Sequence, residues 1–184
     1  MEKQKAREVL ERAKTEEKIV CLYSNPYSDK FAAGFVEAIS ENHVVLRHLT
    51  THGRYDGWVL RALEDLCRIE YGGRYEETLL SLFRARGHSH PAFLHATDES
   101  SDLTAEMLLC AQRNDLAVII DTGSDNDSWG FVKSVETTTV TIEKFNVDGQ
   151  IDSEAVIELE HIGRVTVDDE DMQDLKILAH WRNL

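Results

Sequence analysis

The sequence predicts a mainly β protein with flanking helices, arranged as two tandem five-stranded small barrels. The first observation is that the chain repeats itself at a spacing of 96 residues. The second is that each copy contains short β-branched and apolar runs separated by turn residues, a pattern typical of strands. The third is the helical spacing of apolar residues before and after each set of strands. We expect one barrel within residues 1–86, a connector over 87–100 and a second barrel within 101–184.

The internal repeat is the strongest of these observations. Residues 34–82 align with residues 130–178 without a gap, and 11 of the 49 aligned pairs are identical. Chance would give roughly three identities, and the matched residues are mostly glycines and apolar residues, which a shared fold constrains. We therefore interpret the chain as a tandem duplication of one small unit.

Five strands are expected in each copy. In the first copy, apolar runs bounded by turn residues predict strands at 18–24, 31–39, 44–49, 58–63 and 66–71. In the second copy, the repeat and the local alternation predict matching strands, the last three at 138–145, 154–159 and 162–167. Only two residues separate the last two strands of each copy. That link is too short for a helical crossover, so we expect antiparallel strands or a sharp bend there.

Four helices are expected around the strands. Apolar residues at helical spacing predict helices over 2–16, 75–86, 103–112 and 170–183. In the last of these, Met172, Leu175, Leu178 and Trp181 follow one another at three-residue steps. We expect this stripe to face the core, with Trp181 largely buried.

The charge is distributed unevenly along the chain. The formal net charge is −14. Residues 1–90 carry 14 basic and 14 acidic side chains, whereas residues 91–184 carry 6 and 20. Such asymmetry indicates two units with different surfaces. Because an acidic chain is repelled by phosphate backbones, the composition counts against a general nucleic-acid binder.

The sequence also indicates a cytoplasmic protein with reduced thiols. The number of cysteines is odd, and the charged start of the chain does not resemble an export signal. No apolar run approaches the roughly 20 residues that a membrane helix needs. Cys21, Cys67 and Cys110 fall on apolar runs, so we expect all three to be buried structural thiols.

One segment of the first copy resembles a known family. Residues 34–46 read Gly-Phe-Val-Glu-Ala-Ile-Ser-Glu-Asn-His-Val-Val-Leu, with a glycine inside a strand, a turn and then an apolar run. This pattern is similar to Sm-like barrel proteins, closest to their bacterial RNA-chaperone branch, and other SH3-type barrels share it. The resemblance covers residues 5–71 and 101–167. It implies a short helix followed by five strongly bent antiparallel strands, whose edges join subunits in that superfamily.

The RNA-contact motifs of that family are missing at the matching positions. Its Asp position holds Ser40 and Glu136 in the two copies, and its Asn position holds Val44 and Val140. The turn after the fourth strand reads Leu-Glu-Asp-Leu or Leu-Glu-His-Ile in place of an Arg-Gly pair. A fold can be inherited while its site is lost, so we transfer no RNA-contact residue to this chain.

An acidic loop follows the first strand of the second copy. Its segment Asp121-Thr122-Gly123-Ser124 resembles the active-site turn of aspartic proteases, but that chemistry needs two such carboxylates sharing a proton, and a dimer would have to supply the second. We interpret it as a strand-end turn. The loop also offers oxygen donors suited to Ca²⁺, without the glycine and closing glutamate of an EF-hand. We expect a solvated loop and leave cation binding open for these donors: Asp121, Asp125, Asp127, Ser124 and Ser128.

Two further clusters have a structural and a functional interpretation. His88, His90 and His95 flank a proline in the connector, with Cys67 and Cys110 elsewhere, but zinc sites usually show closer paired spacing. We expect a polar connector and no metal there. The acidic run at 167–171 suits the start of a helix, where it complements the helix dipole. Its alternative interpretation is a patch for a basic protein partner.

Together these observations predict a non-enzymatic binding or scaffold module whose partner is a protein. No catalytic residue, cofactor or metal is expected, the ligand-binding residues stay unknown, and neither DNA nor membrane is expected as a partner. We expect contact with a protein partner or a second copy through the barrel edges, in a monomer or small oligomer. The alternative is an RNA-associated regulator that binds weakly through the neutral first repeat, with these arginines: Arg47, Arg54, Arg61, Arg68 and Arg74.

Overall fold

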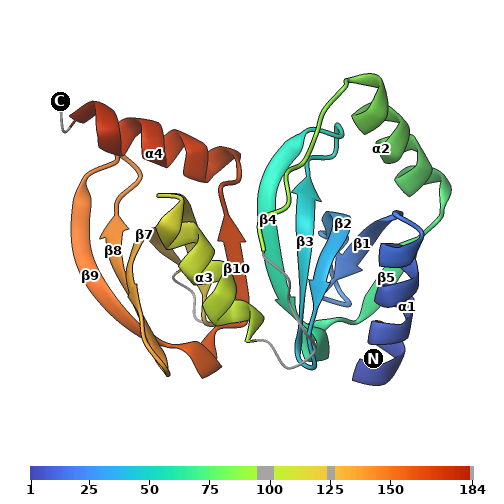
Figure 1. Ribbon diagram of the computed structural model, residues 1–184, viewed down its shortest axis with the longest axis horizontal. Helices are drawn as coiled ribbons and strands as arrows, with labels where there is room; N and C mark the ends of the chain where they lie inside the picture. Colours follow the sequence, from blue (N-terminus) through green and yellow to red (C-terminus); the bar gives the residue numbers. More distant parts are fainter. Residues whose placement is uncertain (95–101, 124–126, 183–184) are drawn as a thin grey trace. The chain divides into compact units, whose positions relative to one another are not determined.

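The computed structural model describes residues 1–94, 102–123 and 127–182. The chain divides into two compact units, Met1–Leu103 and Thr104–Leu184. Each unit is mainly antiparallel β structure with flanking helices, as the sequence predicts (Figure 1). No helix within the described ranges is both long enough and apolar enough to cross a membrane.

The first unit places five strands between two helices. The helices are α1 (Lys3–Thr15) and α2 (Arg74–Ala85). The strands are β1 (Ile19–Tyr23), β2 (Ala32–Ile39), β3 (His43–Leu49), β4 (Tyr55–Ala62) and β5 (Arg68–Tyr71). A 3₁₀ turn, η1 (Leu63–Asp65), follows β4 and redirects the chain, so that β5 pairs with β1. The strand order is β5-β1-β2-β3-β4, and all neighbouring pairs are antiparallel.

The second unit has the same sequence of elements. Its helices are α3 (Leu103–Arg113) and α4 (Glu170–Arg182). Its strands are β6 (Ala117–Asp121), β7 (Ser128–Val135), β8 (Thr139–Phe145), β9 (Ile151–Glu158) and β10 (Arg164–Val167), with a 3₁₀ turn, η2 (Leu159–His161), after β9. The order β10-β6-β7-β8-β9 matches that of the first unit strand for strand.

Both sheets are irregular at the same place. Glu37 in β2 and Lys133 in β7 are skipped in the pairing with the next strand, which marks a β-bulge in each sheet. A bulge bends its strand and increases the local twist. These two residues are 96 positions apart, the spacing of the internal repeat.

A glycine precedes each bulge for a steric reason. A Cβ on Gly34 would collide with the main-chain carbonyl oxygen of Arg47 across the strand pair, and a Cβ on Gly130 would collide with that of Glu143. Glycine inside a strand marks such close approach of two backbones. The same close approach of two backbones is therefore present in both sheets.

Strand β1 is buried on both faces because each face packs against a different helix. On one face, Leu22 belongs to an apolar cluster with Leu10 of α1. On the other, Cys21 belongs to a cluster with Leu79 of α2. The five residues of β1 are all buried, so this strand lies at the centre of the first unit.

The prediction that Trp181 is buried is wrong. Helix α4 packs through Met172, Leu175 and Ala179, whereas Trp181 is 78% exposed. An α-helix turns about 100° per residue, so three-residue steps drift by about 60° each and place Trp181 about 180° from Met172. Burial therefore follows the 3.6-residue period and not the three-residue stripe.

Candidate functional site

Strand β9 is the last strand of the second unit's sheet (Figure 1). It pairs with β8 along its length, from Glu158 opposite Thr139 to Ile151 opposite Phe145. Most of its residues are exposed, and the exposed side chains include Ile151 and Val156, at 60% and 67%. A strand in this position presents a row of unpaired backbone donors and acceptors on its outer edge.

Acidic side chains surround these apolar groups. Asp152, Glu154 and Glu158 lie on β9. Lys133 Nζ lies 3.1 Å from Glu154 Oε2 and 3.3 Å from Glu143 Oε1. Hydrogen bonds to Glu154 and Glu143 raise the pKa of Lys133, which keeps its charge on this surface. Because β9 itself carries three carboxylates and no lysine or arginine, this edge favours a basic partner.

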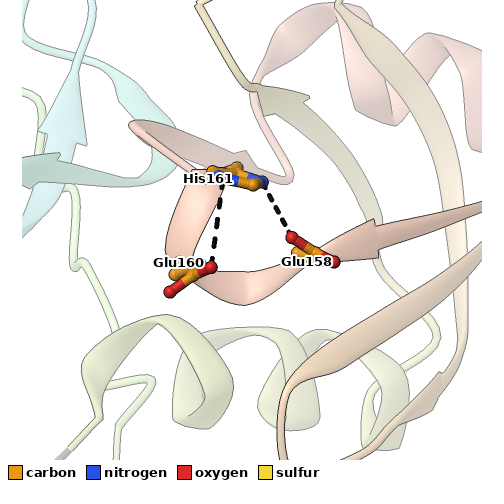
Figure 2. A group of neighbouring side chains, drawn as sticks. All are labelled: Glu158, Glu160 and His161. Atoms are coloured by element: carbon orange, nitrogen blue, oxygen red, sulfur yellow. Dashed lines mark ion pairs between the residues drawn. The ribbon is translucent and has the colours of Figure 1, made fainter.

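Three polar side chains gather where β9 ends and the turn η2 begins. His161 Nδ1 lies 3.1 Å from Glu158 Oε2, and His161 Nε2 lies 4.0 Å from Glu160 Oε1. Figure 2 shows the imidazole facing both carboxylates. One ligand atom from each residue lies within 4.8 Å of the others, so the group could offer three ligands to a metal ion. All three residues are exposed, and exposed acidic groups of this kind are common without an ion, so we assign the group to the acidic surface of this edge.

Residues 88–94, here called the strap, follow helix α2 and pack on the first unit. His90 Nε2 lies 2.8 Å from the carbonyl oxygen of Gly57, and the ring of Phe93 stacks on Trp58 with a centroid distance of 4.3 Å. Phe93 N and Leu94 N both donate to Glu37 Oε1, at 2.5 and 2.7 Å. His90 and Phe93 are both buried. The sequence predicts a polar connector here. This part of the connector is instead docked on the first unit.

Three polar atoms near the strap are buried without a hydrogen-bond partner in the described part of the chain. They are Glu37 Oε2, Arg47 Nε and Trp58 Nε1. Arg47 otherwise donates from Nη1 to the carbonyl oxygen of His90 at 3.5 Å, the limit of a hydrogen bond. A buried donor or acceptor without a partner costs stability, so native structures leave few of them.

Asp121 and Asp127, on either side of residues 124–126, both pair with one arginine. Arg164 Nη2 lies 3.1 Å from Asp121 Oδ2 and 3.0 Å from Asp127 Oδ2. Asp121 Oδ1 also accepts a hydrogen bond from Gly123 N at 2.7 Å, as in a strand-end turn. The guanidinium thus occupies the position that a cation bound by these two carboxylates would need. Ser124 and Asp125 lie outside the described residues, and Ser128 begins strand β7.

The histidines and cysteines do not come together as a site within the described ranges. His88 is exposed, His90 is buried against Trp58, and His95 lies outside the described residues. The expectation of buried thiols is correct for Cys21 and Cys110 and wrong for Cys67, which is exposed just before β5. Burial raises the pKa of the Cys21 thiol, which keeps it protonated and unreactive.

The positions that hold RNA contacts in Sm-like proteins are structural in the first unit. Ser40 is 3% exposed, and its Oγ accepts a hydrogen bond from His43 N. Val44 is fully buried in the core cluster that contacts α1. Arg68, which is not one of those positions but one of the arginines named for the RNA-associated alternative, lies over the ring of Tyr23, 3.6 Å from its centroid, and 3.5 Å from Glu70.

Comparison with known proteins adds no relative. No protein-family model, no curated protein and no solved structure matches this chain. The candidate sites are therefore judged by their geometry and chemistry.

Proposed function

We propose that this protein is a non-enzymatic binding module that takes up an extended segment of a basic protein partner along β9. The observation that carries the proposal is the exposed edge of β9, where apolar Ile151 and Val156 lie among Asp152, Glu154 and Glu158. Main-chain hydrogen bonds to such an edge supply affinity, and alternate side chains supply specificity. Lysine or arginine side chains on the added strand would neutralise the acids of β9.

The proposal includes the architecture expected from the sequence. We propose that the units are tandem Sm-like barrels that arose by duplication. The shared strand order, the bulges at Glu37 and Lys133 and the helix that precedes each set of strands support it. In the superfamily the sequence resembles, barrel edges make the contacts between subunits, which agrees with a binding role for β9.

Selection of displayed peptides tests the binding proposal without a known partner. The purified full chain should enrich extended peptides that alternate apolar residues with lysine or arginine. An enriched peptide, added to the full chain, should then perturb the NMR amide signals of β9 more than those of other strands. If no peptide is enriched, or if the perturbed amides lie elsewhere, the proposal is overturned.

Matched variants separate the edge from bulk charge. Proline lacks the backbone donor and is poorly accommodated in a paired strand, so Val156→Pro should weaken peptide binding at least tenfold. Neutralising two acids of β9 with D152N/E158Q should also weaken binding. Neutralising two exposed acids of α4 with D171N/D174N removes the same charge and should leave binding unchanged. Equal losses in the two double variants would indicate bulk attraction alone.

Light scattering distinguishes a foreign partner from a second copy. We expect a monomer or small oligomer at moderate salt, because the acidic second unit opposes stacking of many chains. A particle of six or more chains would favour the RNA-associated alternative, and filter binding of RNA at two salt concentrations would then test it.

A further inference from the structure

A second, separate feature lies in the first unit, where a small pocket is bounded by the sheet, helix α2 and the strap. Its volume is about 210 Å³. The lining includes apolar Phe35, Leu80 and Phe83 together with Arg47, Arg84 and Ser89. A pocket that combines apolar walls with a few polar groups is the usual form of a small-molecule site, and this one is smaller than the roughly 300–1,000 Å³ of drug-sized sites.

Arg47 has hydrogen-bonding capacity that the protein leaves unused. Within the part of the chain that the structure describes, its Nε is buried without a partner, and its one hydrogen bond, to the carbonyl oxygen of His90, is 3.5 Å long. The guanidinium also lies 5.1 Å from the centroid of the Phe35 ring. A guanidinium carries five donors and is always charged, so it binds carboxylate and phosphate groups strongly.

In the second unit, the charged residue equivalent to Arg47 is neutralised by a neighbouring side chain. Arg47 lies opposite Phe35, and the equivalent Glu143 lies opposite Phe131. Glu143 forms an ion pair with Lys133 of the bulge at 3.3 Å. In the first unit the equivalent bulge residue, Glu37, instead accepts the amides of the strap. Among the described residues, Arg47 therefore has no ion pair like the one that Glu143 forms.

The remaining groups set the charge that the pocket would accept. Arg84 contributes a second guanidinium, and no ion pair joins it to another described residue. Glu17 also lines the pocket and offsets one positive charge. His90 is neutral near pH 7, because burial lowers its pKa. The charged residues that line the pocket therefore sum to one net positive charge, which lies beside apolar walls.

We propose that this pocket binds a small organic anion, a carboxylate or phosphate ester that carries an apolar group. The anionic group binds Arg47 and Arg84, and the apolar group packs against Leu80 and Phe83. The inference does not depend on peptide binding at β9, since every residue it uses belongs to the first unit. The proposal names a class of ligand, whereas the sequence alone left the ligand unknown.

Calorimetric titration of the full chain tests the proposal with benzoate, phenyl phosphate and inorganic phosphate as probes. We expect benzoate or phenyl phosphate to bind with a dissociation constant below 10 mM, and inorganic phosphate to bind at least fivefold more weakly. Preference between the first two identifies the anionic group. If neither organic probe binds, or if inorganic phosphate binds as well as both, the proposal is overturned.

Three arginine variants locate the binding. Arg47→Gln should weaken the organic probe at least tenfold, and Arg84→Gln, on an exposed side chain, should weaken it at least threefold without affecting folding. Arg86→Gln removes the same charge from a neighbouring exposed residue that does not line the pocket, and it should bind as the parent does. Equal affinities in the Arg84 and Arg86 variants would overturn the proposal even if the Arg47 variant did not fold.

Discussion

Arg47 and Glu143 occupy the same register position in the two sheets, each directly opposite a phenylalanine of the preceding strand. The strand pairing is alike at both positions, and a glycine next to each phenylalanine allows the same close approach of the two strands. The side chains carry opposite charges and have different neighbours. Arg47 lies beside the strap, whereas Glu143 pairs with a lysine. The two units thus share a framework and differ in what their surfaces can bind.

The equivalent glycines should be equally intolerant of substitution. Gly34→Ala and Gly130→Ala should each destabilise the protein by about 3 kcal/mol or more, at the upper end of the cost of overpacking, since the new Cβ would meet rigid backbone. Gly87→Ala is the control, because it has positive φ but open space around the Cβ, and it should cost only about 1–2 kcal/mol. Urea unfolding measures all three. A Gly34 variant no less stable than the Gly87 variant would contradict the close approach.

Trp58 and Trp181 should respond differently to truncation. Trp58 is 4% exposed and stacks on Phe93, so Trp58→Ala should lower the free energy of unfolding by about 3–5 kcal/mol. Trp181 is largely exposed on α4, and Trp181→Ala should change it by less than about 0.5 kcal/mol. Hydrogen exchange should also show faster exchange at Phe93 and Leu94 in the Trp58 variant alone. Similar unfolding energies for the two variants would show that the strap does not depend on Trp58.

Docking of the strap should weaken in acid. Burial lowers the pKa of His90 below its ordinary value of 6.5, and the charge of Arg47 lowers it further, against hydrogen bonds to the carbonyls of Pro91 and Gly57. Below about pH 6.5 the unfolded chain therefore binds more protons than the folded chain. The contribution of His90 to stability is fully present above that pH and is lost as the pH falls toward the lowered pKa.

Urea unfolding between pH 7.5 and 5 measures this effect. His90→Gln should reduce the pH dependence of the unfolding free energy by at most about 1.4 kcal/mol per pH unit, the limit for one titrating group. Burial also lowers the pKa of His43, so His43→Gln should reduce the slope independently and add to the first variant. Only the His90 variant should abolish acid-induced exchange of the Phe93 amide. If the unfolding free energy of the His90 variant depends on pH as strongly as that of the parent, His90 is not the titrating group.

The ion pairs of Arg164 should govern how the acidic loop responds to calcium. The parent protein should show no change of melting temperature with Ca²⁺, because the guanidinium lies between Asp121 and Asp127. Arg164→Gln should cost about 1 kcal/mol or less, since these groups are partly exposed, and should make melting depend on Ca²⁺. Arg68→Gln, at the equivalent position of the first unit, is the control and should introduce no such dependence. Stabilisation of the parent by Ca²⁺ would refute this role for Arg164.

Local pattern was enough to predict the helices and strands. In residues 18–24, successive side chains point to opposite faces of the strand. Both faces are buried, because one packs against α1 and the other against α2. The glycine inside the strand at residues 31–39 is also a local signal, because close backbone approach requires glycine whatever else surrounds it. The exposure of Trp181 was not predicted, because a three-residue stripe resembles a helical face over one turn and departs from it over three turns.

The candidate sites depended on contacts that no local pattern encodes. Nothing near Phe93 indicates that it meets Trp58, and Arg47 and Glu143 lie in similar strands yet differ in partners supplied by other segments. The exposed edge of β9 likewise follows from the order of strands in space. The sequence by itself determined the repeated unit, its strands and its glycines, since periodicity and backbone sterics act over a few residues. Only the tertiary structure decided which charges are paired, which edge is open and where the strap docks, because these depend on residues brought together from distant parts of the chain.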